Sequence, residues 1–331
     1  MEIAYVTYQL NDLDTAEAFL ADFGLTRSAR TDDMLYMRGC GPAPYIYVAR
    51  RGSDNRFLGG GFGVGSRGDL DALAGLPGSS AIEDLEAPGG GQRVRMTMPD
   101  GFVIDAVHGV ARLPPLPLRP PNPFNAAQDK RRFNVSLRPK REPCPVLRLG
   151  HFVLHVSDHE VAVRWFQERL GLLPSDHLCV PGDERTVVGT FLRCDRGEQF
   201  VDHHSLLVLQ SARAGVHHCS FEVQDIDAIM GAHEYLAERG YRLDCGVGRH
   251  LLGSQIFDYW RDPFGFRVEH YTDGDVVNHL HSPQKFAGTA DQTTQWGMRP
   301  PLEFFERYGR APGARLRSEP DGSRSRDDDY S

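Results

Sequence analysis

Residues 150–172 read GHFVLHVSDHEVAVRWFQERLGL, and residues 3–25 read IAYVTYQLNDLDTAEAFLADFGL. Each stretch predicts a strand, a polar cap, an amphipathic helix and a glycine at the end of the helix. Three pairs of residues match at a constant spacing of 147 positions: Phe19 with Phe166, Gly24 with Gly171, and Leu25 with Leu172. A repeat of this length predicts two similar modules within one chain.

The two copies also close in the same way. Residues 99–105 read PDGFVID and residues 263–269 read PFGFRVE, so in each copy a tight turn leads into a strand that carries a carboxylate. In the second copy Ser157 and Glu160 have the spacing of a capping box, and Gly171 suits the C-cap of the helix. A further helix is expected at about residues 226–239.

The repeat predicts an α+β fold in which paired βαβββ modules form curved mixed sheets in two homologous domains. We expect a metal-free N-terminal domain at residues 1–110 and a metal-binding domain at residues 146–275. Residues 111–145 between them are rich in Pro and Arg and predict a connector without regular structure. Residues 276–310 are expected to form a lid segment, and the polar residues 311–331 a disordered tail.

Composition narrows the class of protein. The 331 residues are 40% hydrophobic and 25% charged, as in a globular protein with a sizeable core. The net charge of −8 argues against nucleic acid as the main partner. No stretch approaches the roughly 18 apolar residues of a membrane span, and the first residues lack a secretory signal pattern. We therefore expect a cytoplasmic protein that acts on a small molecule.

Alternation along three expected strands places metal-binding side chains together, because successive side chains of a strand point to opposite faces. Three strands of one curved sheet can aim His151, His218 and Glu269 inward. Two histidines and one carboxylate bind one side of a ferrous ion and leave its other positions open. His155 shares the face of His151 but lies about 13 Å along the strand. It is expected to line a pocket or to have a structural role.

This pattern of ligands occurs in one copy only. The matched positions of the first copy keep a single carboxylate: Ala4 for His151, Phe62 or Gly59 (depending on the gap chosen) for His218, and Asp105 for Glu269. A single histidine in a strand usually belongs to the core or the surface. Structural histidines would not be expected to cluster in one copy, so we expect the metal in the second domain alone.

Several short stretches of the second domain agree in order and spacing with a known family: Leu149–His151, Asp202–Ser205, Val216–Val223, Gly248–His250, Phe257–Tyr259, and Asp262–Gly265 leading to Val268–Glu269. In these stretches the domain resembles the catalytic domain of type I extradiol ring-cleavage dioxygenases, in the vicinal oxygen chelate superfamily. The first domain resembles the metal-free N-terminal domain of that family more weakly.

The resemblance implies that the chain opens the ring of a catechol-like aromatic diol with dioxygen. It implies a mononuclear Fe(II) ion held by His151, His218 and Glu269, and the same ligands also suit Mn(II). We expect a homo-oligomer whose partners are the small aromatic diol and dioxygen, without nucleic acid or membrane.

The resemblance also places His204, His250 and Tyr259 beside the metal. It implies that His204 hydrogen-bonds dioxygen and supplies a proton, while His250 and Tyr259 hold the substrate oxygen. By residue type alone, His203 competes with His204 for this role. His217 competes in the same way with His218 for the metal.

The turn at residues 262–265 supports the choice of Tyr259. If the turn centres on Phe264, Tyr259 and Glu269 are equidistant from it and face each other across a hairpin, with Cβ atoms about 5 Å apart. An ordinary aromatic residue of a strand pair would satisfy the same pattern. In the lid segment Trp296, Arg299 and Phe304-Phe305 follow the catalytic domain. Arg299 suits a substrate carboxylate, but a surface position is the commoner one for arginine.

Two other functions fit parts of the sequence. A glyoxalase or epimerase of the same superfold resembles this sheet, but it consumes no oxygen. A non-catalytic module that binds a small molecule needs no metal triad. The stretch Gly248–His250 and Tyr259 weigh against the glyoxalase or epimerase, and oxygen consumption with a catechol tests that function. Tight binding of iron would count against the non-catalytic module.

Overall fold

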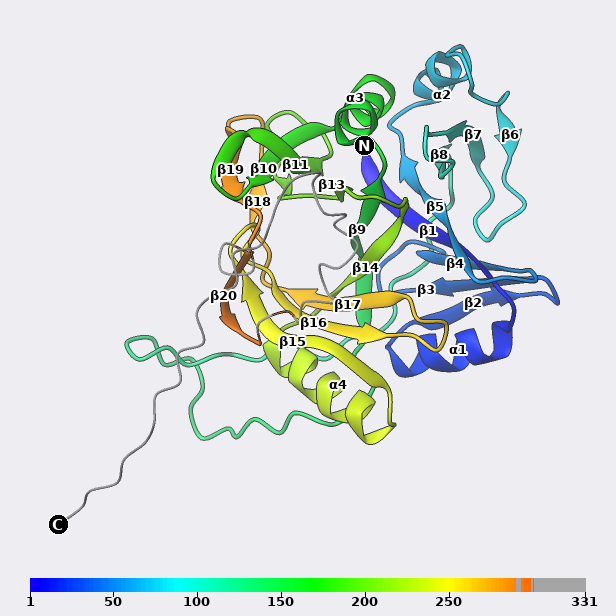
Figure 1. The fold of residues 1–331 in the computed structure, drawn as a ribbon. Coiled ribbons are helices and arrows are strands. Elements are labelled where there is room, and N and C mark those ends of the chain that lie inside the picture. Colours follow the sequence, from blue (N-terminus) through cyan, green and yellow to red (C-terminus); the bar gives the residue numbers. More distant parts are fainter. Residues whose placement is uncertain (290–292, 299, 301–331) are drawn as a thin grey trace, which may run out of the picture.

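The computed structural model describes residues 1–289, 293–298 and 300 and contains two large mixed sheets (Figure 1). The first sheet is built from β1 (Glu2–Leu10), β2 (Thr26–Arg30), β3 (Met34–Arg38), β4 (Tyr47–Arg51), β5 (Arg56–Gly63), β6 (Glu83–Asp84), β7 (Gln92–Thr97) and β8 (Val103–His108). Its strand order is β2-β3-β4-β1-β5-β8-β7-β6. The helices of this part are α1 (Leu13–Asp22) and α2 (Arg67–Ala74).

The second sheet is built from β9 (Val146–Val156), β10 (Leu173–Val180), β11 (Asp183–Arg193), β13 (Leu206–Gln210), β14 (Gly215–Val223), β15 (Arg242–His250), β16 (Ile256–Arg261), β17 (Arg267–Thr272), β19 (Gln284–Ala287) and β20 (Thr294–Gly297). Its order is β19-β10-β11-β13-β9-β14-β17-β16-β15-β20. The helices are α3 (His159–Leu170) and α4 (Ile226–Glu238), and β12 (Val201–Asp202) pairs separately with β18 (Val276–Val277). Figure 1 shows this sheet curling from β10 and β11 round to β16 and β15. The predicted fold class of curved mixed sheets in two similar modules is confirmed.

The two modules share one hydrophobic core. Phe152 of β9 packs against Phe57 and Phe62 of β5, with ring centroids 5.9 and 6.0 Å apart. Tyr8 of β1 meets Phe266, in the turn before β17, at 4.9 Å. The first sheet ends at His108, and the second begins at Val146 and includes β19 and β20 beyond residue 275. The division into domains at residues 1–110 and 146–275 stays a prediction.

Residues 109–145 contain no helix or strand, as expected for the connector. This segment bonds to both ends of α4: Arg119 pairs with Asp225 at 2.6 Å, and Arg141 with Glu238 at 2.5 Å. In the middle of the helix, Gly231 leaves room for the carbonyl oxygen of Lys140, which would lie only 2.4 Å from an added Cβ atom. The connector therefore wraps the outer side of α4 (Figure 1).

The cap of α3 differs from the prediction. The N-cap is Asp158, whose carboxylate accepts from the backbone N–H of Val161 at 3.0 Å. Ser157 instead donates its hydroxyl to Asp100 at 2.6 Å, across to the first module. The predicted capping box of Ser157 and Glu160 is therefore wrong. Either Ser157 or Asp158 could cap the helix, and the contact with Asp100 engages Ser157. Gly171 is confirmed as the C-cap with φ +62°, and α4 lies where it was expected.

The structure describes part of the expected lid segment, at residues 276–289, 293–298 and 300. β20 adds to the edge of the sheet beside β15, and Trp296 lies under the guanidinium of Arg249 at 5.7 Å. Arg299, Phe304-Phe305 and the expected tail at 311–331 lie outside the described residues. No helix among the described residues is both long and apolar enough to cross a membrane.

Asp22 at the end of α1 fastens the first module to α4. Its carboxylate accepts from the hydroxyls of Tyr235 and Tyr241, both at 2.7 Å, and pairs with Arg239 at 3.0 Å. Burial alone would raise the pKa of Asp22, but these hydrogen bonds lower it below its ordinary value of 3.8. The charged form is therefore stabilised in the folded chain.

Asp22→Asn should lower the free energy of unfolding by about 1–3 kcal/mol at pH 7, because three donors lose a charged acceptor. The folded pKa is below the unfolded one, so the contribution is complete above about pH 4 and is lost as the pH falls below it. Urea unfolding of wild type and variant between pH 7 and pH 3 checks this. Asp71→Asn, which breaks an exposed pair with Arg67 at 3.3 Å, should cost less and serves as the control. An equal loss of unfolding free energy in both variants would contradict a stabilising role for the contacts of Asp22.

Candidate metal centre

Three neighbouring strands bring the predicted ligands together. Ser220 of β14 pairs with His151 of β9 on one side and with Glu269 of β17 on the other. His218 lies two residues before Ser220 and therefore points to the same face of the sheet. The alternation of the three strands thus turns two imidazoles and one carboxylate toward one point, as the sequence predicts.

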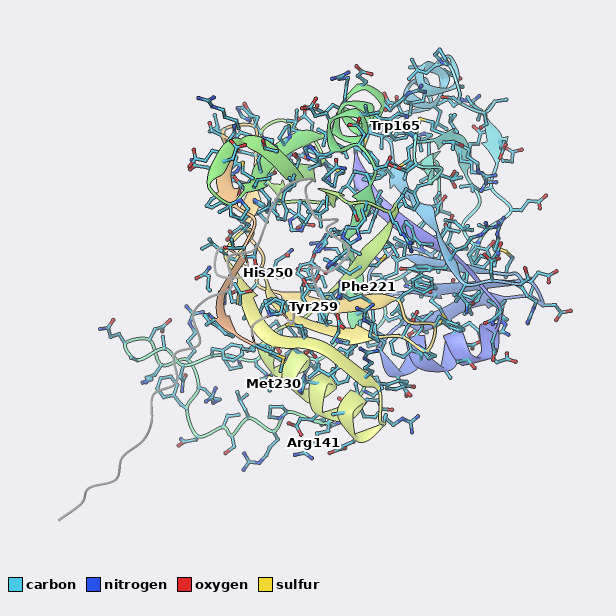
Figure 2. All side chains as sticks on the ribbon, viewed as in Figure 1. Arg141, Trp165, Phe221, Met230, His250 and Tyr259 are labelled. Carbon is cyan, nitrogen blue, oxygen red and sulfur yellow. The ribbon has the colours of Figure 1, made fainter. Side chains whose placement is uncertain are left out.

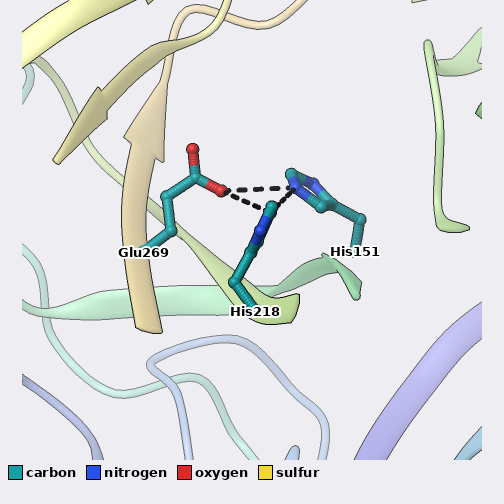
Figure 3. Close-up of side chains that lie close together, drawn as sticks. All are labelled: His151, His218 and Glu269. Carbon is teal, nitrogen blue, oxygen red and sulfur yellow. Dashed lines mark hydrogen bonds and ion pairs between the residues drawn. The ribbon is translucent and has the colours of Figure 1, made fainter. Parts of the chain in front are cut away.

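The three side chains converge closely (Figure 3). The Nε2 atoms of His151 and His218 are 3.2 Å apart, and each lies 3.3 Å from Oε2 of Glu269. All three residues are buried, with Glu269 fully enclosed. They form one of two groups among the described residues whose ligand atoms lie close enough to share an ion.

The donor set fits a divalent cation. Burial would raise the pKa of Glu269, but the imidazoles of His151, His218 and His250 lower it well below its usual range, so the carboxylate is charged. Neither of its oxygens has a hydrogen-bond partner among the described residues. Burial lowers the pKa of His218 to about 4, so its ring is neutral. A buried charge without a partner is unfavourable, and a cation held by this carboxylate and the two imidazole nitrogens supplies the missing partner.

Backbone and side-chain packing fix the ligand rings. Any Cβ atom on Gly150 would lie 2.2 Å from the hydroxyl of Tyr271, so only glycine fits before His151. His217 lies on the far side of His218, with their Nδ1 atoms 2.6 Å apart, and Arg267 donates to Nε2 of His217 at 2.7 Å. Partners of this kind orient the rings of metal-binding histidines. His217 is therefore placed behind His218 and outside the converging group.

His204, His250 and Tyr259 lie around the three converging residues. The ring of His204 packs on His151 with centroids 4.2 Å apart. Nε2 of His250 lies 2.8 Å from the hydroxyl of Tyr259 and 3.7 Å from Oε1 of Glu269. Figure 2 shows His250 and Tyr259 pointing from β15 and β16 toward the space inside the curled sheet. The pairing of Tyr259 with Glu269 across the hairpin is observed as predicted.

His204, His250 and Tyr259 line a cavity of about 80 Å³ together with His151, His217 and His218, and the remaining wall is mostly apolar. The apolar residues are Val153, Leu178, Phe191, Leu207, Leu209 and Leu252, and Gln255, Thr293 and Pro300 complete the lining. None of the described lining residues is Arg, Lys, Asp or Glu. These apolar residues were not predicted as part of the site. Leu207 and Leu209 alternate along β13 and share one face of the strand, so this pattern could have identified them from the sequence.

Two of the candidate histidines lie away from the centre. His203 turns from the cavity toward Asp176, with Nε2 2.9 Å from the carboxylate, although it is adjacent to His204. His155 is buried with its ring 5.1 Å from that of His217, and it lines a different cavity. The expected separation of His155 from the metal position therefore agrees with the structure.

The first module places other residues at the corresponding positions. Gly61 pairs with Tyr5 and Asp105 as Ser220 pairs with His151 and Glu269, so Tyr5 lies where His151 lies. The same register puts Gly59 in the place of His218. The expected match of Ala4 with His151 is wrong by one position. The N-caps show why: Asp12 and Asp158 are 146 positions apart, as Tyr5 and His151 are, whereas Gly24 and Gly171 are 147 apart. The second copy therefore has one extra residue between the N-cap of α3 and Gly171.

Asp105, the counterpart of Glu269, has its charge balanced by the protein itself. The hydroxyl of Tyr5 donates to the Asp105 carboxylate at 2.7 Å, and Arg95 donates to it at 3.3 Å. Arg95 pairs with Asp105 across the strands and so occupies the position that corresponds to Tyr259. Arg93 lies 3.7 Å away. An internal cation thus takes the place of a metal in the first module.

Comparison with known proteins agrees with this geometry. Residues 148–270 match the family model described as the Glyoxalase/Bleomycin resistance protein/Dioxygenase superfamily. Metapyrocatechase 2 of Cupriavidus necator is 28% identical over 320 residues, which cover 92% of this chain and 91% of that protein. The iron-dependent extradiol dioxygenase of Rhodococcus jostii is 26% identical over 137 residues, or 39% and 44% of the two chains. The second module thus matches this superfamily, and the whole chain is similar to a protein named as a metapyrocatechase.

A solved member of this superfamily has a similar fold over nearly the whole length. The Mn(II)-bound glyoxalase from Novosphingobium aromaticivorans is 26% identical, with a TM-score of 0.74, and the alignment covers 91% of this chain and 92% of that one. The two-module arrangement of this chain is therefore shared with a metal-bound relative.

Glu269→Gln should weaken the binding of Fe(II) or Mn(II) by about 100-fold or more, because it removes the one anionic ligand. The metal-free variant should unfold at the same temperature as the metal-free wild type or higher, because a buried charge without a partner is gone. Anaerobic metal titration and thermal unfolding measure both effects. Glu222→Gln is the control: Glu222 lies on β14, the strand of His218, and pairs with Arg148 of β9, so this variant should keep its metal. Unchanged metal affinity of Glu269→Gln would refute the ligand set.

Proposed function

We propose that the chain cleaves the ring of a catechol-like diol with dioxygen, in the extradiol position. The observation that carries this is a charged, buried Glu269 that converges with the imidazoles of His151 and His218, and both imidazoles line an apolar cavity. Metapyrocatechase 2 matches along nearly the whole chain, which supports the same reaction class. Extradiol cleavage needs a metal with open positions for two reactants, and a face bound by His151, His218 and Glu269 leaves those positions open.

We propose Fe(II) as the working metal, held by His151, His218 and Glu269. When bound, it would lower the pKa of a substrate hydroxyl and hold both reactants in reach of each other. The relative of Rhodococcus jostii is named as iron-dependent, which supports iron, whereas the glyoxalase of similar fold binds Mn(II). The ligand types suit both ions. Assembly into a homo-oligomer stays a prediction.

His204 is the proposed acid and base. Burial, followed by the neighbouring His151, lowers the pKa of His204 well below its ordinary value, so the ring is neutral before substrate enters. A neutral imidazole can take the proton that the substrate hydroxyl loses and return it later in the reaction. His204 stacks on His151 and lines the cavity, which puts it within reach of both reactants.

His250 and Tyr259 are proposed to hold the substrate oxygen. The Nδ1 atom of His250 lies 3.2 Å from the carbonyl oxygen of Thr293 and donates to it, and Nε2 of the same ring lies 2.8 Å from the hydroxyl of Tyr259. Burial and the charge of Glu269 raise the pKa of Tyr259 well above 10, so the phenol keeps its proton. The pair thus presents fixed polar groups on one side of the cavity.

The wall of the cavity favours a compact diol with a neutral, apolar ring substituent. Leu178, Leu207 and Leu252 can exclude water from such a substituent, and each buried CH₂ group contributes about 0.8 kcal/mol. A carboxylate on the ring would meet no arginine or lysine among the described lining residues. It would also lie near the charge of Glu269, so its burial is unfavourable.

With Fe(II) added anaerobically, the chain should consume one dioxygen per catechol and form a yellow ring-fission product. Catechol and short alkylcatechols should react with kcat/KM at least about tenfold above that of a carboxylated catechol, since an unpaired charge is hard to bury. An oxygen electrode with a catechol panel measures this. Glyoxalase chemistry, the other function predicted from the sequence, uses no oxygen. Turnover of a glutathione hemithioacetal without any oxygen uptake from catechols would therefore establish glyoxalase activity instead.

His204→Ala should keep its metal and lower kcat by about 10²–10⁴-fold, which is the usual contribution of general acid–base catalysis. Metal content, kcat and KM at saturating oxygen are the measurements. His233→Ala is the control, because His233 lies on α4 and bonds to Asp258 outside the cavity. A His204→Ala chain with wild-type kcat would rule out the assigned role.

A further inference from the structure

A buried hydrogen-bonded chain leads from the metal centre through His204 to a second histidine and a carboxylate. The Nδ1 atom of His204 lies 3.1 Å from Nδ1 of His203, and Nε2 of His203 lies 2.9 Å from Oδ2 of Asp176. All three side chains are at most 5% exposed. Asp176 belongs to β10, whereas the two histidines precede β13, so the chain joins two separate strands of the sheet.

The order of donors and acceptors along this chain follows from chemistry. A carboxylate can only accept, so Nε2 of His203 carries the hydrogen that faces Asp176. With this single hydrogen on its ring, His203 accepts at Nδ1, and Nδ1 of His204 donates to it. The remaining nitrogen of His204, Nε2, therefore carries a lone pair. Asp176 thus decides which nitrogen of His204 can accept a proton.

We propose that Asp176 and His203 are positioning residues for the reaction, which hold His204 in the orientation and tautomer that accept the substrate proton. The inference rests on the proposed function and adds two residues to it. Neither residue lines the metal cavity, and both line a separate outer cavity together with His281. They act on the substrate through His204 alone.

A second metal ion is the competing interpretation, since ligand atoms of Asp176, His203 and His281 lie close together. Here, however, the polar atoms already have partners. The second carboxylate oxygen of Asp176 accepts from the backbone N–H of Gln284 at 2.8 Å, and Nε2 of His281 donates to the carbonyl oxygen of Ser175 at 2.9 Å. Glu269 differs, because its oxygens have no hydrogen-bond partner among the described residues. The geometry therefore favours a hydrogen-bonded chain.

Asp176→Asn tests the tautomer directly. The backbone N–H of Gln284 still needs an acceptor, so the amide oxygen should face it and the amide N–H₂ group should face His203. Nε2 of His203 must then accept, and the hydrogens along the chain reverse, which leaves Nε2 of His204 protonated. We expect kcat to fall about 10–100-fold, in the range found for partners of metal-site histidines, with unchanged KM and metal content.

Three further variants make the test specific. His203→Phe breaks the hydrogen-bonded chain at its middle and should lower kcat about as much as Asp176→Asn. The double variant should lower kcat no more than either single variant, because the effects of residues that act as a unit are not additive. Asp176→Glu restores a carboxylate and should recover part of the lost kcat. Asp275→Asn is the matched control: it lines the same outer cavity and is exposed, and its carboxylate accepts from Ser254.

The outcomes separate this inference from the proposed function. A wild-type chain that consumes no oxygen with any catechol overturns both together. An active wild type with unchanged kcat in Asp176→Asn overturns the positioning role alone. Loss of one metal equivalent in Asp176→Asn, with the ion at Glu269 retained, would show a second metal site and also overturn it. If Asp176→Asn fails to fold, His203→Phe and its kcat decide.

Discussion

A charged carboxylate that is fully enclosed, and whose oxygens have no hydrogen-bond donor among the described residues, is the constraint on which this structure depends. Burial of an ion without a partner costs several kcal/mol, so Glu269 needs a cation within reach. The surrounding imidazoles of His151 and His218 can complete the coordination of a metal. Strand pairing fixes the separation of these groups before any ion binds, because His151 and Glu269 flank the same residue, Ser220.

The first module meets the same constraint by another route. Asp105 has the same position in the strand register of the first sheet as Glu269 has in the second, but a tyrosine hydroxyl and arginine side chains surround it. An arginine is a permanent cation, so no metal is needed there. The two modules thus share a backbone and differ in the source of positive charge. The module with imidazoles keeps a site that can exchange its ion and admit substrate.

The sequence predicted those features that depend on local periodicity. Alternation along strands identified the inward faces, and the turn at residues 262–265 fixed the pairing of Tyr259 with Glu269. The spacing of 147 residues gave the repeat but misplaced Tyr5 by one position. Matches at the end of a helix cannot reveal where an extra residue was inserted, and here it lies within α3. The cap of α3 was misassigned for a related reason, since a distant contact with Asp100 engages Ser157.

Features that depend on distant segments were beyond the sequence. His203 and His204 are adjacent in a loop, and only the meeting of that loop with β10 decides which ring faces the metal. The ligands lie on the central strands β9, β14 and β17, whereas His250 and Tyr259 come from β15 and β16 toward the edge. Central strands are held on both sides, so the ligand geometry is rigid. His250 and Tyr259 depend instead on strands nearer the edge of the sheet, where β20 is the last strand.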